Sequence, residues 1–230
     1  MEFPIARAIR RPAHAVAARR LSWLSAWLLL AAWLLAMGIA RAAAPDPMAP
    51  PNELIQQAAN NVLEAIRKDQ ELKSGSLDRV NQAVDELILP YVDFETTTRL
   101  AAGRAWRSAT PEQRQRLVQE FRNMLVRTYG GAVSNITPQA RVDMKPFRAE
   151  PGATDVVVRT MVSDGQREPV QVDYRLEKTP NGWKIYDLNV LGVWFIQNYR
   201  NQFSSIVARD GVEGLIRALS DRNQQMKMNR

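Results

Sequence analysis

The chain has 230 residues and no cysteine, which excludes disulfides and thiolate chemistry. Its 31 basic and 24 acidic residues give a formal net charge of +7 at pH 7. Six of the 31 basic residues and one of the 24 acidic residues lie in residues 1–42, so residues 43–230 keep 25 and 23 and a net charge of only +2. So small a net charge gives no general attraction to polyanions, and the composition does not favour nucleic acid as a partner.

The first predicted element is an export signal. Five arginines precede an apolar run over residues 21–40, and Ala40-Arg41-Ala42 fits an A-x-A processing site. We therefore expect residues 1–42 to be a cleaved signal peptide, which removes His14, the only histidine of the chain. Two alternatives stay open: the apolar run is long enough to span a bilayer uncut, and Arg19-Arg20 could belong to a twin-arginine signal.

Helical patterns follow the signal segment. Residues 43–51 contain four prolines and are expected to form a stiff tether. Apolar residues at helical spacing then predict three helices, with Asn52, Ser76 and Asp93 as N-caps. These helices cover about residues 52–73, 76–89 and 93–102.

The next helix has the clearest start signal. Thr110-Pro111-Glu112-Gln113 combines a capping threonine, a proline at the first helical position and a glutamine at the third. The apolar pattern reaches Tyr129 and could extend to Ile136, which places Gly130-Gly131 inside the helix. These glycines allow two interpretations. They could mark a kink or a close contact between helices, or their missing side chains could make room for a ligand.

From Ala140 the apolar period changes from about 3.6 residues to 2, which predicts strands. Turn signals at Asp164-Gly165 and at Thr179-Pro180-Asn181-Gly182 join them into a four-stranded antiparallel meander. A helical segment opens at Gly192, and a last helix, capped by Asp210, precedes a polar tail over residues 224–230.

One face of this sheet is apolar and must be covered, and only the helices at the two ends of the chain are available. The predicted fold is therefore α+β: a curved four-stranded antiparallel sheet covered by N-terminal and C-terminal helices, which enclose an apolar cavity. Residues 52–223 are expected to form this single domain. Periodicity alone leaves open whether the inward aromatic residues fill an ordinary core or line a ligand chamber.

Few residues offer catalytic chemistry. Carboxylates are scattered without metal-ligand spacing, and no phosphate-binding or nucleophile motif occurs. Asp187 stands among apolar neighbours, and we expect it to accept backbone N–H groups or pair with an arginine, a catalytic role being the alternative. We accordingly expect no enzyme activity, no cofactor and no metal.

The order of several motifs resembles the MlaC (toluene-tolerance) family of periplasmic phospholipid carriers. The resemblance covers residues 51–223 and is carried by these strings: Leu89-Pro90-Tyr91-Val92-Asp93-Phe94, Gly103-Arg104-Ala105-Trp106, Ala109-Thr110-Pro111-Glu112-Gln113-Arg114, Trp183-Lys184-Ile185-Tyr186-Asp187-Leu188 and Asn198-Tyr199-Arg200-Asn201-Gln202-Phe203. It implies a monomeric periplasmic shuttle that moves phospholipid between the outer and inner membranes and maintains outer-membrane lipid asymmetry. Its implied partners are an outer-membrane lipoprotein–porin complex and an inner-membrane ABC transporter with an MCE-domain subunit.

On this hypothesis the inward residues form the lipid-binding wall: Leu125, Tyr129, Val133, Val142, Met144, Val156, Val158, Val172, Tyr174, Leu188, Val193, Tyr199 and Phe203. Arg104 and Arg200 could steer partners or a headgroup phosphate, or simply be solvated surface charges. Two other functions remain as alternatives: a membrane-tethered periplasmic adaptor without ligand, and an exported enzyme that acts through carboxylates.

Overall fold

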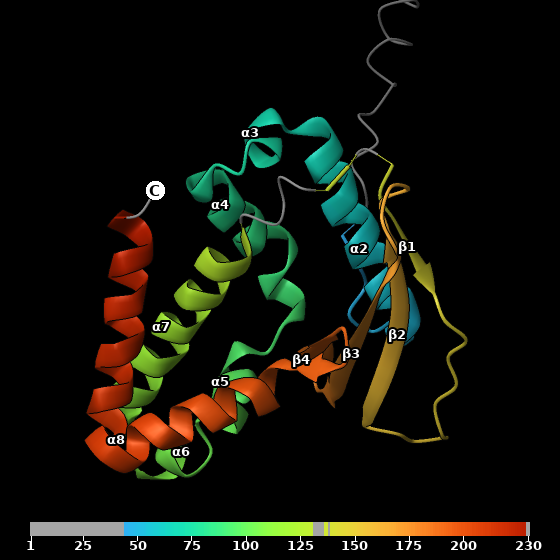
Figure 1. Cartoon of the computed structure of the whole chain (residues 1–230). Helices are drawn as coiled ribbons and strands as arrows, with labels where there is room; N and C mark the ends of the chain where they lie inside the picture. The colour runs from blue at the N-terminus through green and yellow to red at the C-terminus, as the bar shows by residue number, and fades with distance from the viewer. Residues whose placement is uncertain (1–43, 131–135, 138, 229–230) are drawn as a thin grey trace, which may run out of the picture. The chain divides into compact units, whose positions relative to one another are not determined.

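The computed structural model describes residues 44–130, 136–137 and 139–228, and its first elements are three helices: α2 (Pro51–Lys68), α3 (Gln70–Lys73) and α4 (Leu77–Leu87) (Figure 1). The expected first helix is thus broken at Asp69, where the backbone is extended and the carboxylate accepts hydrogen bonds from the N–H groups of Glu71 and Leu72. Ser76 precedes α4 as predicted. The prediction of Asn52 as an N-cap is wrong, because Pro51 already takes the first helical position.

A helical turn and two short helices come next: η1 (Leu89–Tyr91), α5 (Phe94–Ala102) and α6 (Arg104–Ser108). The predicted cap of α5 is confirmed, since the Asp93 carboxylate accepts the Thr96 N–H at 2.7 Å. Gly103 separates α5 from α6 at φ +58°, a conformation that favours glycine. Helix α6 was not expected from the sequence.

Helix α7 (Pro111–Tyr129) begins with the predicted capping box. The Thr110 hydroxyl accepts the Gln113 N–H at 3.2 Å, and the Gln113 side chain accepts the Thr110 N–H at 3.1 Å. The helix does not reach Ile136. A Cβ on Gly130 would lie 3.1 Å from Cγ1 of Val80 on α4, so this glycine is a point of close helix contact, while Gly131 lies outside the described residues.

The sheet is an antiparallel meander in chain order, with five strands instead of four: β1 (Arg141–Met144), β2 (Asp155–Ser163), β3 (Val170–Thr179), β4 (Gly182–Val190) and β5 (Val193–Trp194). The fifth strand arises because Val193 and Trp194 pair with Val190 and Asn189, where the sequence suggested a helix. Val158 faces Tyr174 across the β2–β3 ladder, and Tyr174 faces Leu188 across β3–β4, which places the three side chains on one face.

Helix α8 (Phe195–Met228) consists of two helical segments joined at Gly211, whose φ of 68° and ψ of −170° are non-helical. This break confirms the predicted restart at Asp210. The helix continues beyond residue 223, where a polar tail was expected, because the buried Asn223 amide donates to the Glu120 backbone oxygen at 2.9 Å and to its carboxylate at 2.7 Å.

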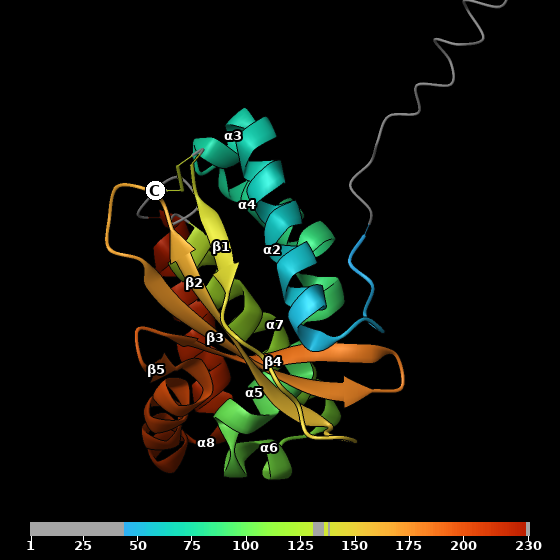
Figure 2. The same cartoon turned by 90° about the vertical axis from the view of Figure 1, so that its right-hand side faces the viewer.

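Helices from both ends of the domain cover the sheet, which confirms the predicted α+β architecture. Helix α2 lies along β1 and β2, and α5 and the start of α8 contact β4 (Figures 1 and 2). Helices α7 and α8 pack against each other around Leu117, Phe121 and Leu215, a second core apart from the one under the sheet. No helix in the described ranges is long and apolar enough to cross a membrane.

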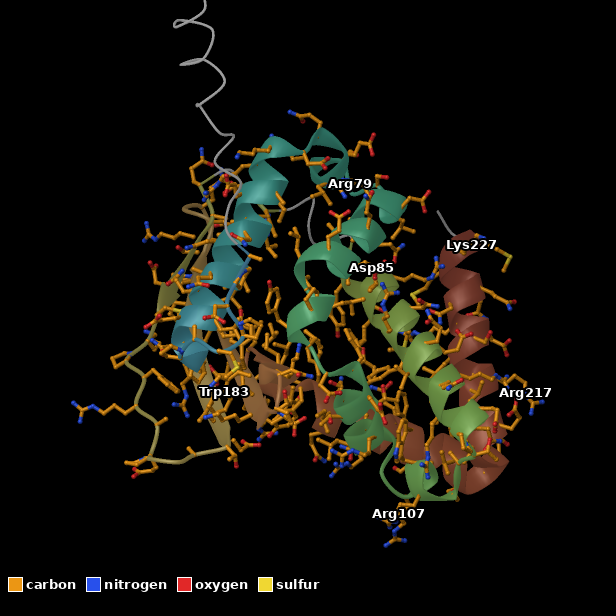
Figure 3. All side chains as sticks on the ribbon, turned by 180° about the vertical axis from the view of Figure 1, so that it is seen from behind. Arg79, Asp85, Arg107, Trp183, Arg217 and Lys227 are labelled. Carbon is orange, nitrogen blue, oxygen red and sulfur yellow. The ribbon has the colours of Figure 1, made fainter. Side chains whose placement is uncertain are left out.

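The proline-rich segment before α2, which the sequence predicted as a stiff tether, contacts the sheet through Pro47. Trp183, at the start of β4 and next to α2 in Figure 3, donates its backbone N–H to the Pro47 carbonyl at 2.8 Å. The adjacent Gly182 has φ +100°, and a Cβ there would lie 2.3 Å from the same carbonyl oxygen. Pro47 and the β3–β4 turn therefore meet at a contact that only glycine permits.

Candidate functional site

Two adjoining apolar cavities lie between the sheet and the helices. The first, of about 280 Å³, is lined mainly by α2 and the sheet, and the second, of about 370 Å³, by α4, α7 and β4. Four residues line both: Ile88, Val92, Ile185 and Leu188. The two cavities are thus the first lobe and the second lobe of one chamber.

The first lobe exists because the inner face of α2 combines branched and small residues. Ile55 and Val62 supply apolar surface, while Ala58 and Ala59 between them leave room toward the sheet. The opposite wall comes from Val142, Val162 and Tyr174 on β1, β2 and β3.

The second lobe reaches the surface at Tyr129. This residue lines the lobe and is also 42% exposed, so solvent and chamber meet there. Its ring stacks on Phe195, with centroids 5.1 Å apart, and its hydroxyl lies 3.4 Å from that of Tyr199. Leu125 on α7 and Val84 on α4 continue the apolar wall inward.

The few polar side chains of the chamber are engaged in the fold. Thr97 donates its hydroxyl to the Tyr186 carbonyl at 2.7 Å, and the Tyr186 hydroxyl donates to Asp155 at 2.7 Å. Desolvation by burial, the largest cause, raises the pKa of Tyr174 and of Tyr186 above the ordinary tyrosine value. The hydroxyl groups of Thr97 and Tyr186 therefore already have partners within the fold.

Asp187 is the carboxylate of the second lobe, and its side chain has a structural role, as the sequence predicted. Its oxygens accept the N–H groups of Leu188 at 2.9 Å and Ile196 at 3.0 Å, and the Arg175 guanidinium at 3.0 Å. Burial raises the pKa of Asp187 more than these contacts lower it. Within the described residues, no three His, Asp or Glu side chains gather as metal ligands would.

Such a chamber suits the flexible hydrocarbon part of a ligand. Binding pockets for small molecules span about 300 to 1,000 Å³ and are mostly apolar, and the two lobes together fall in this range. The opening beside Tyr129 would let a polar end of the ligand stay in water.

The structure brings five of the expected wall residues together in the chamber, and seven others lie outside its two lobes. Those that line the chamber are Leu125, Tyr129, Val142, Tyr174 and Leu188. Met144, Val156 and Val158 belong to the core under the sheet, and Tyr199 and Phe203 pack edge-on against Phe121 in the α7–α8 core. Val172 lines neither lobe, Val193 is 52% exposed on β5, and Val133 lies outside the described residues.

The sequence interpretation missed the residues that join the two lobes, Ile88, Val92 and Ile185. Ile88 belongs to the apolar stripe that predicted α4, and Ala59 and Val62 belong to the stripe that predicted α2. The stripes were interpreted only as cover for the sheet, although a covering face and a chamber wall have the same periodicity.

Comparison with known proteins decides the family. The family model described as MlaC protein matches residues 56–221. This chain belongs to the MlaC family. The toluene tolerance protein ttg2D of Pseudomonas putida is 26% identical to it over 163 residues, which cover 70% of this chain and 74% of that protein.

Two further relatives carry names that describe a ligand. The intermembrane phospholipid transport system binding protein MlaC of Haemophilus influenzae is 22% identical over 169 residues, covering 72% of this chain and 78% of the relative. A phospholipid-binding protein from Ralstonia solanacearum, solved in complex with a phospholipid, is 45% identical with a TM-score of 0.75. The match covers 78% of this chain and 99% of the solved chain.

Proposed function

We propose that this protein is a phospholipid carrier that buries acyl chains in the two-lobed chamber and moves phospholipid between the two membranes of the cell envelope. The observation that carries the proposal is the apolar chamber beside an exposed Tyr129. Membership of the MlaC family and the 45% identity to a protein solved with bound phospholipid support it.

Hydrocarbon burial alone supplies enough affinity for such a carrier. Each buried methylene contributes about 0.8 kcal/mol, so about ten of them contribute about 8 kcal/mol. That free energy corresponds to a dissociation constant of about 1 μM before the entropic cost of association. The chamber therefore needs no polar anchor, and the headgroup can remain in solvent beside Tyr129.

The compartment and partners belong to the same proposal. Residues 1–42 have the pattern of a cleaved export signal, which supports a carrier that acts in the periplasm. We further propose that it acts as a monomer. We assign it two docking partners on the family resemblance: an outer-membrane lipoprotein–porin complex and an inner-membrane ABC transporter with an MCE-domain subunit. Maintenance of outer-membrane lipid asymmetry follows as its physiological role.

The direct test is native mass spectrometry of the protein recovered from the periplasm without detergent, followed by organic extraction. We expect a one-to-one adduct that extracts as phospholipid. A protein that is isolated bare, and that takes up no phospholipid from added vesicles, would refute the carrier function.

A matched pair of substitutions links the adduct to the chamber. Val84 lines the second lobe, whereas Val118, also half-buried and helical, packs against the α7–α8 core outside the chamber. We expect Val84→Trp to lower the bound phospholipid per folded molecule severalfold, because the indole occupies acyl-chain space. Val118→Trp should leave it unchanged; equal loss in both variants would place the lipid elsewhere.

A further inference from the structure

A second concave surface lies away from the chamber, between α5, α6 and the first half of α8. This groove has a volume of about 960 Å³. Four arginines line it: Arg99 and Arg104 beside the α5–α6 junction, Arg107 on α6 and Arg200 on α8. We call it the arginine groove.

The charge of the groove is concentrated and uncompensated. No acidic residue lines it, so its four arginines give +4, twice the net charge of +2 that residues 43–230 carry in all. Among the described residues, no carboxylate lies within 4.0 Å of any of these four guanidinium groups, whereas Arg79, Arg122 and Arg175 each contact one. Uncompensated like charges in a concave surface attract an anionic partner.

The groove is also shaped and partly apolar. Leu100, Ala102 and Val207 contribute carbon surface between the arginines, and nothing lies within 4 Å of where a Cβ on Gly103 would be. A trough of this kind admits a convex polypeptide segment, whereas a flat bilayer surface would meet only its rim.

One rim of the groove is held in place. The Arg200 guanidinium donates two hydrogen bonds, of 2.9 and 2.7 Å, to the Leu100 carbonyl near the end of α5, so it links α8 to α5. Arg107, by contrast, projects from α6 away from the domain (Figure 3), where its guanidinium is free to meet a carboxylate.

We propose that the arginine groove docks an acidic polypeptide segment of a partner protein, with carboxylates on Arg104 and Arg107 and apolar side chains on Leu100 and Val207. The proposal uses no residue of the lipid chamber, so it can be confirmed or refuted independently of the carrier function. A phospholipid surface or a free phosphate also carries negative charge but lacks the convex polypeptide segment with apolar side chains. Both are tested as competing occupants of the groove.

The test measures binding of a short helical peptide of alanine and leucine that carries glutamates along one face, with its glutamine counterpart as the uncharged control. The protein is used as recovered from the periplasm. Arg104→Gln/Arg107→Gln removes two groove charges, and Arg148→Gln/Arg217→Gln removes two exposed charges elsewhere (Arg217 is labelled in Figure 3). A third variant, Ser204→Trp, fills the groove without changing its charge.

We expect the glutamate peptide to bind and the glutamine peptide to bind much more weakly. Arg104→Gln/Arg107→Gln should weaken binding about tenfold, as expected for two charge-assisted contacts, and the control pair less than about twofold. Ser204→Trp should weaken it comparably, because it removes space. Uptake of phospholipid from added vesicles, which involves no partner protein, should be unchanged in every variant, and this separates the result from the carrier function.

Three outcomes would overturn the proposal. The first is no preference for glutamate over glutamine, and the second is equal weakening by the two arginine pairs. The third is binding of phosphatidylglycerol vesicles or inorganic phosphate through Arg104 and Arg107 without binding of the peptide, which would assign the groove to a lipid surface or to an anion.

Discussion

Asp187 and Arg175 face each other across β3 and β4, with Oδ2 of the carboxylate 3.0 Å from Nη1 of the guanidinium. The other carboxylate oxygen accepts the Ile196 N–H in the first turn of α8, and the guanidinium lies 3.8 Å from the centre of the Trp194 ring. One ion pair therefore joins two strands to the start of the helix that closes the second lobe.

Removal of the Asp187 carboxylate should destabilise the fold strongly. Asp187→Ala leaves the Ile196 N–H and the Arg175 guanidinium without their acceptor in a site where Asp187 is only 2% exposed. We expect a loss of about 2–4 kcal/mol in the free energy of unfolding, measured by urea denaturation. Asp187→Asn should cost less, since it keeps an acceptor oxygen and resembles the protonated acid that burial favours.

Asp85 is the matched control for Asp187. It pairs with Arg122 at the surface, where more than half of its side chain is exposed, so Asp85→Ala should cost at most about 1 kcal/mol. Equal losses from the two alanine substitutions would show that the buried pair has no special role.

The contact between Gly182 and Pro47 makes a second stability prediction. Gly182→Ala places a methyl group against the Pro47 carbonyl at a positive φ and should cost about 3 kcal/mol or more. Gly152→Ala has a similar backbone strain, φ +78°, but meets nothing within 4 Å, and should cost about 1 kcal/mol. The predicted difference would be disproved by equal urea midpoints. In Gly182→Ala we also expect faster proteolysis between residues 44 and 50.

Tryptophan substitutions distinguish the chamber from the neighbouring core. Tyr174 lines the first lobe, so Tyr174→Trp should lower extracted phospholipid with little change in stability. Val158 is fully buried in the core under the sheet, and Val158→Trp should instead destabilise the fold by about 1–3 kcal/mol, with phospholipid per folded molecule unchanged. Reversal of the two phenotypes would mean that Val158, and not Tyr174, lines the space that holds the lipid.

Alkaline pH should weaken the fold through Tyr199. Burial, and then the neighbouring Tyr129, raise the pKa of Tyr199 above the value of about 10 for an unfolded tyrosine. Its stabilising contribution is therefore complete below about pH 10 and is lost as the pH rises toward the folded-state pKa. Tyr199→Phe should lose less stability than the native protein between about pH 9 and about pH 11. A pH-independent difference in urea midpoint would contradict this.

Local signals in the sequence predicted the helix starts and the strand ladder well, because caps and turns act through nearby atoms. Asp93 and Thr110 cap the predicted helices, and Asp210-Gly211 marks the break in α8. Some errors had local causes, such as the helix break at Asp69, and others came from tertiary contacts. Asn223 extends α8 by bonding to Glu120 on another helix, which no local pattern reveals.

The chamber could be predicted as a possibility, but its wall only in part. Tyr174 in a strand and Phe203 in a helix were both predicted to point inward, yet one lines the first lobe and the other packs against Phe121. Small residues such as Ala58 and Ala59 line the first lobe, where larger side chains would fill the space. Periodicity indicates which side chains point inward, but not whether other side chains pack against them or leave a cavity.

Helices α5 and α8 each contribute to both the chamber and the arginine groove: Phe94 and Phe195 line the second lobe, while Leu100 and Arg200 line the groove. Binding at two sites built on the same elements obeys thermodynamic linkage. A partner that prefers the lipid-free form tenfold must lower phospholipid affinity tenfold, and one that prefers the loaded form must raise it equally. Loading and release can therefore be directed by which partner occupies the groove, without any energy source in the carrier itself.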